Sequence, residues 1–166
     1  MIQLFRIGDE FAGAGELGDV GGEYNGVTTG QSLQDDRTPE QLTAEAVEAA
    51  KKADYVIFVG GMNKAHNQDC EDGDRLHYEL PYGQDQLISA LAAVNDKVVF
   101  VSISGNAHGM PWSQEVGAIL QAWYSGSETG HAVADVLFGD VNPSGKLPYT
   151  IQPTLADYPA HQYGEV

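Results

Sequence analysis

Two short runs of apolar residues most constrain how this chain can fold. Residues 55–59 read Tyr-Val-Ile-Phe-Val, and residues 98–103 read Val-Val-Phe-Val-Ser-Ile. Runs of β-branched and aromatic residues of this length are typical of strands buried on both faces, as in parallel sheets. Gly60 and Gly61 end the first run. Residues 104–106, Ser-Gly-Asn, follow the second run and could line a site there, but a turn explains them without a function and is favoured. The chain is therefore expected to contain buried parallel strands that end in loops.

Helical patterns precede the first run and separate it from the second. Thr38 can cap a helix that begins at Pro39, and Gln41 can complete a capping box. A second helix is predicted over residues 84–94, where three apolar residues share one face. The apolar face of the first helix, which should pack on a sheet, consists of Leu42, Ala46, Ala49, Ala50 and Ala53.

The rest of the chain continues the alternation of strands and helices. The pattern predicts a strand over residues 2–7, a strand over residues 118–124, a helix over residues 130–138 and a closing strand over residues 147–151. This order is typical of an α/β fold with a mostly parallel sheet flanked by helices, that is, an α/β sandwich. The length of 166 residues fits a single domain. Its glycine-rich segment 1–36 is expected to be irregular after the first strand.

The composition argues against several classes of partner and of structural feature. Eight basic and 24 acidic side chains give a formal net charge of −16, which argues against binding to nucleic acid or to an anionic membrane surface. Cys70 is the only cysteine, so an internal disulfide is excluded. No apolar run approaches the roughly 20 residues of a membrane-spanning helix, and no signal-peptide pattern is present at the N-terminus.

The side chains best suited to catalysis or ligand binding are concentrated in residues 69–75, Asp-Cys-Glu-Asp-Gly-Asp-Arg. This stretch follows the first buried strand. Loops at the carboxyl ends of strands are where α/β sheets place their functional groups. A solvated acidic turn, or a brace between an aspartate and Arg75, would explain the same residues. A calcium loop is a third interpretation, although the spacing of Asp69, Glu71 and Asp74 does not match the usual pattern.

Six short motifs occur in order along the chain. They are Val-Gly-Gly at 59–61, Glu-Asp-Gly-Asp-Arg at 71–75, Leu-Pro-Tyr-Gly-Gln at 80–84, Met-Pro-Trp at 110–112, Ala-Trp-Tyr-Ser-Gly-Ser-Glu at 122–128 and Gly-Asp-Val-Asn-Pro-Ser-Gly-Lys-Leu-Pro at 139–148. Together they make residues 36–161 resemble the C-terminal α/β-sandwich domain of family 3 glycoside hydrolases, and the β-glucosidase branch most closely. The chain departs from the family at Asp72, where glycine is usual.

The resemblance implies a role in hydrolysis of O-glycosidic bonds in β-glucosides by a retaining mechanism. Glu71 is then the general acid/base, with Asp69 as the alternate, and a TIM-barrel domain in the parent protein supplies the nucleophile. This chain should therefore be inactive alone. The resemblance also implies that both ends of the domain are truncated, which would expose a sheet edge and favour a homodimer. By analogy, the parent would be periplasmic or secreted.

Other residues are assigned by the same resemblance or by their local pattern. His66, Asp69 and Trp112 are candidates for binding carbohydrate, either a β-glucoside or an oligosaccharide. Asp74 and Arg75 are expected to form a structural pair. No cofactor is implied, and the spacings of the five histidines fit no zinc site.

Four further expectations complete the sequence-based interpretation. Trp123 and Tyr124 fall in a strand pattern and are expected to pack in the core. The loop over residues 64–75 is expected to be mobile, which would leave Glu71 exposed. A carbohydrate-binding or protein-interaction module without catalysis is the alternative function. A nucleotide-binding domain is disfavoured because Gly60 and Gly61 are not followed by a phosphate-binding glycine pattern.

Overall fold

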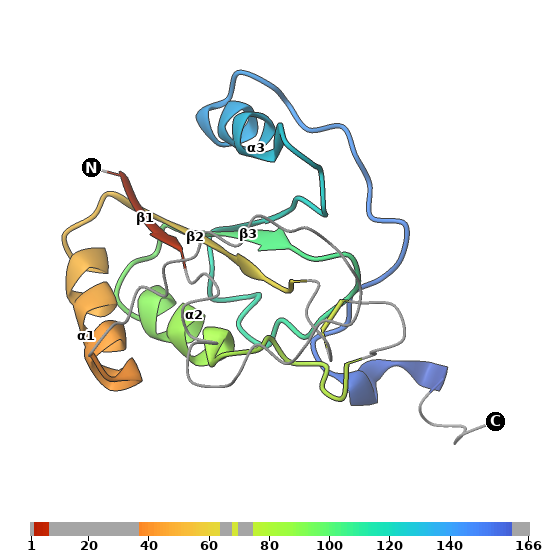
Figure 1. Ribbon diagram of the computed structural model, residues 1–166, viewed down its shortest axis with the longest axis horizontal. Helices are drawn as coiled ribbons and strands as arrows, with labels where there is room; N and C mark the ends of the chain where they lie inside the picture. The colour runs from red at the N-terminus through yellow and green to blue at the C-terminus, as the bar shows by residue number, and fades with distance from the viewer. Residues whose placement is uncertain (1, 7–36, 64–67, 70–74, 161–166) are drawn as a thin grey trace, which may run out of the picture.

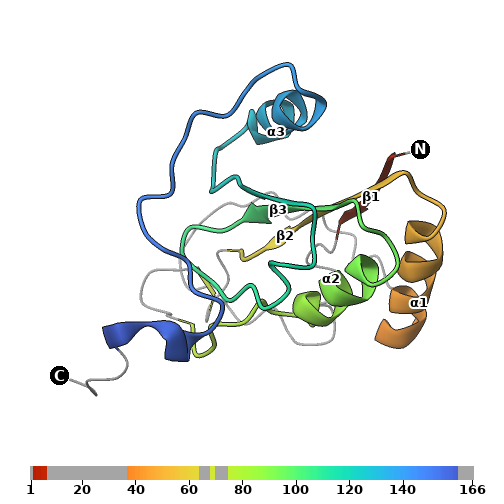
Figure 2. The ribbon, with the colours of Figure 1, turned by 180° about the vertical axis from the view of Figure 1, so that it is seen from behind.

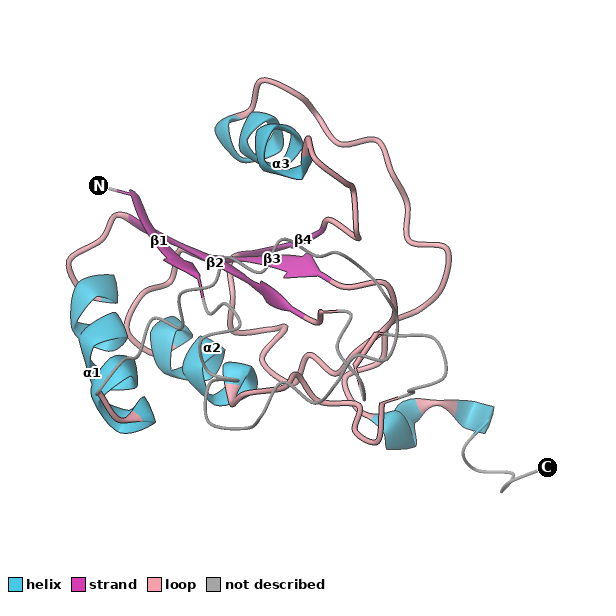
Figure 3. Cartoon of the chain, in the orientation of Figure 1, coloured by secondary structure: helices cyan, strands magenta, loops and turns pink. Residues whose placement is uncertain are grey.

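The computed structural model describes residues 2–6, 37–63, 68–69 and 75–160, and their centre is a parallel sheet (Figure 1). Four strands pair in chain order, β1-β2-β3-β4. Their bounds are Ile2–Arg6, Tyr55–Gly61, Val98–Ile103 and Ala118–Gln121. Every neighbouring pair is parallel, and Figure 3 shows the strands side by side. The prediction of an α/β fold with a mostly parallel sheet is confirmed.

The first helix, α1 (Pro39–Ala50), begins as its sequence predicts. The Thr38 hydroxyl accepts a hydrogen bond from the Gln41 amide at 3.3 Å, and the Gln41 side-chain oxygen accepts one from the Thr38 amide at 2.8 Å. Pro39 occupies a first-turn position where the absence of an N–H has no cost. The capping box therefore fixes where the chain enters this helix.

A hydrophobic core fills the space between one face of the sheet and the helices α1 and α2 (Gln84–Ala92). Both helices lie on the same side of the sheet in Figures 1 and 2. Phe58 of β2 and Phe100 of β3 pack with their ring centroids 5.8 Å apart. The buried members of this core include Ala46, Ala50, Val56, Phe58, Leu87, Ile88, Leu91, Val98, Phe100 and Trp112.

The third helix, α3 (Thr129–Phe138), lies on the opposite side of the sheet and buries none of its residues (Figure 2). Gly139 caps its C-terminus, with a left-handed φ of 85° that glycine readily adopts. Phe138, its last residue, is 67% exposed. The predicted helix exists, but among the described residues it adds nothing to the main core. In the described part of the chain, none of the helices combines the length and the apolar character needed to span a bilayer.

Two predicted strands differ from the structure. The strand predicted over residues 118–124 ends at Gln121, and Trp123 already has a left-handed φ of 56°. The closing strand predicted over residues 147–151 is wrong, because that segment contains no strand. Pro148 within it has no N–H to donate to a ladder, and Tyr149 instead packs edge-on against Trp123 at 5.9 Å. In the described part of the chain, β1 and β4 are the outer strands of the sheet. The homodimer expected from an exposed sheet edge stays a prediction.

Gly61, at the carboxyl end of β2, is a position that only glycine fits. Its φ is 132°, and a Cβ there would lie 2.1 Å from the carbonyl oxygen of Ile103. Gly61→Ala is therefore expected to lower the free energy of unfolding by at least about 1–3 kcal/mol, measured by urea denaturation. Gly130→Ala is the matched control, because its Cβ would meet nothing within 4 Å and alanine is the better helix former. Equal midpoints for Gly61→Ala and the unsubstituted chain would contradict this prediction.

Candidate functional site

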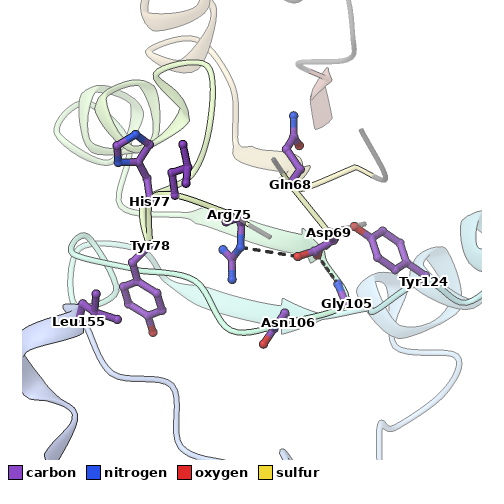
Figure 4. Close-up of a pocket in the computed structure, with 10 residues that line it drawn as sticks. Gln68, Asp69, Arg75, His77, Tyr78, Gly105, Asn106, Tyr124 and Leu155 are labelled. Atoms are coloured by element: carbon purple, nitrogen blue, oxygen red, sulfur yellow. Dashed lines mark hydrogen bonds and ion pairs between the residues drawn. The ribbon is translucent and has the colours of Figure 1, made fainter. Parts of the chain in front are cut away.

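A pocket of about 550 Å³ lies where the loops after β2, β3 and β4 meet (Figure 4). Parallel strands bring their carboxyl ends to one edge of the sheet, so the loops that follow them converge there. The lining residues are Gln68, Asp69, Arg75, Leu76, His77, Tyr78, Gly105, Asn106, Tyr124 and Leu155. The pocket therefore combines a carboxylate, a guanidinium, amides and aromatic rings contributed by distant parts of the sequence.

Asp69 is the most constrained of these groups. Its Oδ2 accepts hydrogen bonds from the Gly105 amide at 2.7 Å and from the Tyr124 hydroxyl at 3.0 Å. Its Oδ1 forms an ion pair with Nε of Arg75 at 3.7 Å (Figure 4). Only 7% of the Asp69 side chain is exposed. A carboxylate held in this way accepts hydrogen bonds and is poorly placed to give a proton to a ligand.

Arg75 is the last residue of the acidic stretch 69–75 and lines the same pocket. Its side chain is 14% exposed, and Nη2 donates a hydrogen bond to the carbonyl of Ala107. Its buried Nη1 has no hydrogen-bond partner among the described residues. Asp74, the partner expected for Arg75, lies outside those residues, and the carboxylate that the structure places beside Arg75 is that of Asp69. An aspartate therefore does pair with Arg75, but it is Asp69, and the pair of Asp74 with Arg75 stays a prediction.

Tyr124 lies in the pocket rather than in the core, so its predicted position is wrong. The β4 strand ends at Gln121, and the left-handed backbone at Trp123 turns the chain out of the sheet. Tyr124 keeps 36% of its surface exposed while its hydroxyl donates to Asp69. Partial burial and the charge of Asp69 raise the pKa of Tyr124, so its hydroxyl stays protonated and remains a donor at neutral pH.

Comparison with known proteins assigns the chain to a family. The family profile described as the glycosyl hydrolase family 3 C-terminal domain matches residues 5–165. The chain belongs to this family. It is 56% identical over 129 residues to beta-glucosidase BoGH3A of Bacteroides ovatus, covering 78% of this chain and 17% of that protein. It is 48% identical over 124 residues to the probable beta-glucosidase H of Aspergillus clavatus, covering 74% of this chain and 15% of that protein.

Solved structures of two beta-glucosidases share the fold described above. Beta-glucosidase from Kluyveromyces marxianus in complex with glucose aligns with a TM-score of 0.70 and 35% identity, covering 76% of this chain and 15% of that one. The GH3 beta-glucosidase of Bifidobacterium adolescentis aligns with a TM-score of 0.64 and 39% identity, covering 76% of this chain and 19% of that one. The chain thus spans less than a fifth of the length of each of these relatives.

Trp112 of this family 3 domain is a core residue, although the sequence made it a candidate for binding carbohydrate. Its side chain is fully buried and packs edge-on against Phe100, with ring centroids 4.7 Å apart. Its indole Nε1 donates a hydrogen bond to Oδ1 of Asp85 at 2.6 Å. Burial raises the pKa of Asp85, whose other oxygen accepts a hydrogen bond from the Leu80 amide. Neither face of Trp112 is therefore free for a pyranose ring.

His108 is a second buried polar residue of the domain, and its contacts fix its tautomer. Its Nδ1 lies 3.0 Å from the carbonyl of Gly109, which can only accept, so Nδ1 carries the proton. Its Nε2 lies 2.9 Å from the Ser102 hydroxyl and therefore accepts from it. Burial lowers the pKa of His108, which favours the neutral ring that this arrangement requires. We assign these contacts a structural role.

Several predicted site residues lie outside the described part of the chain. These are Glu71, the predicted acid/base, together with His66 and Asp74. Most of the loop predicted to be mobile, 64–75, also lies outside it. The described residues contain no group of three or more histidine, cysteine or acidic side chains placed to hold a metal.

Part of the pocket consists of residues for which the sequence favours another role. A turn was preferred to a site at residues 104–106, yet the Gly105 amide donates a hydrogen bond to Asp69 and Asn106 lines the pocket. Their place directly after a buried parallel strand was the signal that pointed to this edge of the sheet.

Proposed function

We propose that this chain is the accessory part of a retaining β-glycosidase of the β-glucosidase type. In this proposal Glu71 is the general acid/base that protonates the departing oxygen of a β-glucoside and later activates water. The support is the membership of family 3 together with relatives that are named as beta-glucosidases, one of them solved with glucose. The nucleophile would come from a TIM-barrel domain of the parent protein.

The observation that carries the proposal is the anchoring of both flanks of the acidic stretch at one pocket. Glu71 follows Asp69 by two residues and precedes Arg75 by four. Asp69 and Arg75 line the pocket and form an ion pair with each other. A catalytic acid needs a defined place near its substrate, and fixed flanking residues favour that.

The geometry also favours Glu71 over Asp69 as the acid. Asp69 is 7% exposed, and its oxygens are already engaged by Gly105, Tyr124 and Arg75. A general acid must reach the leaving oxygen within hydrogen-bonding distance, and these contacts hold the Asp69 carboxylate away from solvent. We therefore propose that Asp69, the alternate acid/base, instead helps to hold the loop in place.

A carbohydrate-binding module without catalysis is the second candidate. It is favoured by the composition of the pocket, where the partly exposed ring of Tyr124 lies near the polar side chains of Asn106 and Gln68. An aromatic face with adjacent hydrogen-bonding groups suits a sugar ring, and such binding needs no acid.

The two candidates separate in an assay of the chain by itself. We expect no turnover of an aryl β-glucoside, because one carboxyl group of a pair cannot replace the missing nucleophile and loss of one catalytic partner costs orders of magnitude. Titration calorimetry with the same glucoside measures binding in parallel. Binding that is unchanged in Glu71→Gln would support the non-catalytic module. Turnover that scales with protein concentration and disappears in Glu71→Gln would contradict the need for a barrel.

A further inference from the structure

The Asp69 carboxylate joins three segments that are distant in the sequence. It accepts hydrogen bonds from Gly105, 36 residues away, and from Tyr124, 55 residues away. These partners come from the loops after β3 and β4, whereas Asp69 belongs to the loop after β2. Because the side chain is 7% exposed, water cannot easily replace either donor.

We propose that Tyr124 and Asp69 are positioning residues for the acid/base, with the Tyr124 hydroxyl fixing the carboxylate that anchors the chain beside Glu71. This inference rests on the proposed function and adds two residues to it. Asp69 also faces Arg75, so the same carboxylate ties both flanks of residues 70–74. Neither Tyr124 nor Asp69 needs to touch the reacting atoms to have this effect.

The backbone around Tyr124 favours its contact with Asp69. A Cβ at residue 105 would lie 2.9 Å from Cε2 of Tyr124, so glycine there lets the tyrosine ring approach the loop after β3. The left-handed φ of 56° at Trp123 is rare for a large side chain and turns Tyr124 toward the pocket. Backbone conformations of this kind persist where the surrounding contacts hold them.

The chemistry explains why such an anchor matters. An acid contributes only when its proton lies in line with the leaving oxygen, and a displacement of about 1 Å can cost about 100-fold in rate. An activated leaving group departs without that proton, so the rate with such a substrate is insensitive to the placement of the acid. Loss of the anchor should therefore show a dependence on the leaving group.

The test uses Tyr124→Phe in the complete enzyme that carries this sequence, because this change removes a single hydroxyl and keeps the ring. We expect kcat/KM for an alkyl β-glucoside to fall about 10- to 100-fold, the effect of losing one hydrogen bond to a charged group. For a dinitrophenyl β-glucoside it should stay within about threefold. Asp69→Asn should show the same pattern, and the double variant should lose less than the product of the two single effects.

Tyr158→Phe is the matched control. It also removes a hydroxyl, which lies 3.1 Å from the carbonyl of Thr150 and 3.0 Å from the hydroxyl of Tyr78 at the pocket wall. Tyr158 itself does not line the pocket, and none of these printed contacts involves Asp69. Thermal unfolding of each variant shows whether a change in stability accompanies the kinetic effect. The inference is overturned if Tyr124→Phe behaves like Tyr158→Phe, or if Tyr124→Phe slows both substrates equally.

Failure of this inference is distinguishable from failure of the proposed function. If Glu71→Gln shows no dependence on the leaving group, the acid/base assignment itself is wrong. If Glu71→Gln shows that dependence and both Tyr124→Phe and Asp69→Asn lack it, the assignment stands and the positioning role is excluded.

Discussion

Glu71→Gln in the complete enzyme is expected to slow hydrolysis of alkyl β-glucosides by about 10²- to 10⁴-fold, the usual contribution of a general acid. Glutamine keeps the size of the side chain but cannot donate the proton that an alkoxide leaving group requires. A dinitrophenyl β-glucoside should keep most of its rate of glycosyl transfer to the enzyme, because its leaving group departs unprotonated. Steady-state and pre-steady-state rates with both substrates measure this difference.

Asp72→Asn is the matched control, since it neutralises the neighbouring carboxylate of the same stretch. We expect it to affect both substrates alike and only modestly. An equal loss for both substrates in Glu71→Gln would indicate a structural role for Glu71. A fully active Glu71→Gln enzyme would move the assignment to Asp69, against the geometry of its carboxylate.

Trp112→Ala is expected to lower the free energy of unfolding by about 3–5 kcal/mol, as truncation of a large buried aromatic residue does. The indole is fully buried against Phe100, so its removal leaves a cavity in the core. It also leaves Oδ1 of Asp85 without the donor that satisfies it. Urea denaturation followed by circular dichroism measures the loss.

Two further variants divide this loss into its causes. Trp112→Phe removes the indole N–H but keeps an aromatic ring. Because the ring still fills part of the core, this variant should lose less stability than Trp112→Ala. Trp123→Ala truncates the other tryptophan, which is only partly buried beside Tyr149, and should be milder than Trp112→Ala. A Trp112→Ala protein as stable as Trp123→Ala would contradict the core position of Trp112.

Local pattern was enough to predict most of the elements and the parallel sheet. The capping residues Thr38 and Gln41 located α1, and β3 occupies the predicted residues 98–103. These features depend on residues close in sequence, where spacing and backbone preference act directly. The segment 147–151 has the apolar residues of a strand but is not part of the sheet in the described structure.

The aromatic residues of the site could not be assigned by local pattern. Trp112 follows a proline in a loop and was a candidate for binding carbohydrate, but it is buried against Phe100 of β3 and Asp85 of α2. Tyr124 looked like a core residue of a strand, yet β4 stops before it. Burial of a side chain depends on residues far away in the sequence, and the contact of Asp69 with Tyr124 spans 55 residues.

The pairing of the strands in chain order has a consequence for how the sheet can assemble. Each strand pairs with the strand that follows it, so the sheet can grow outward by one strand at a time. The entropic cost of closing a loop rises with its length, and the connection from β3 to β4 is the shortest of the three. Pairing of β2 with β3 brings together the two phenylalanine rings of the core, and burial of their apolar surface stabilises the pair. Assembly that begins around β3 would therefore bring the Gly105 and Tyr124 donors into place before the sheet is complete, so that the Asp69 carboxylate meets them as β2 docks.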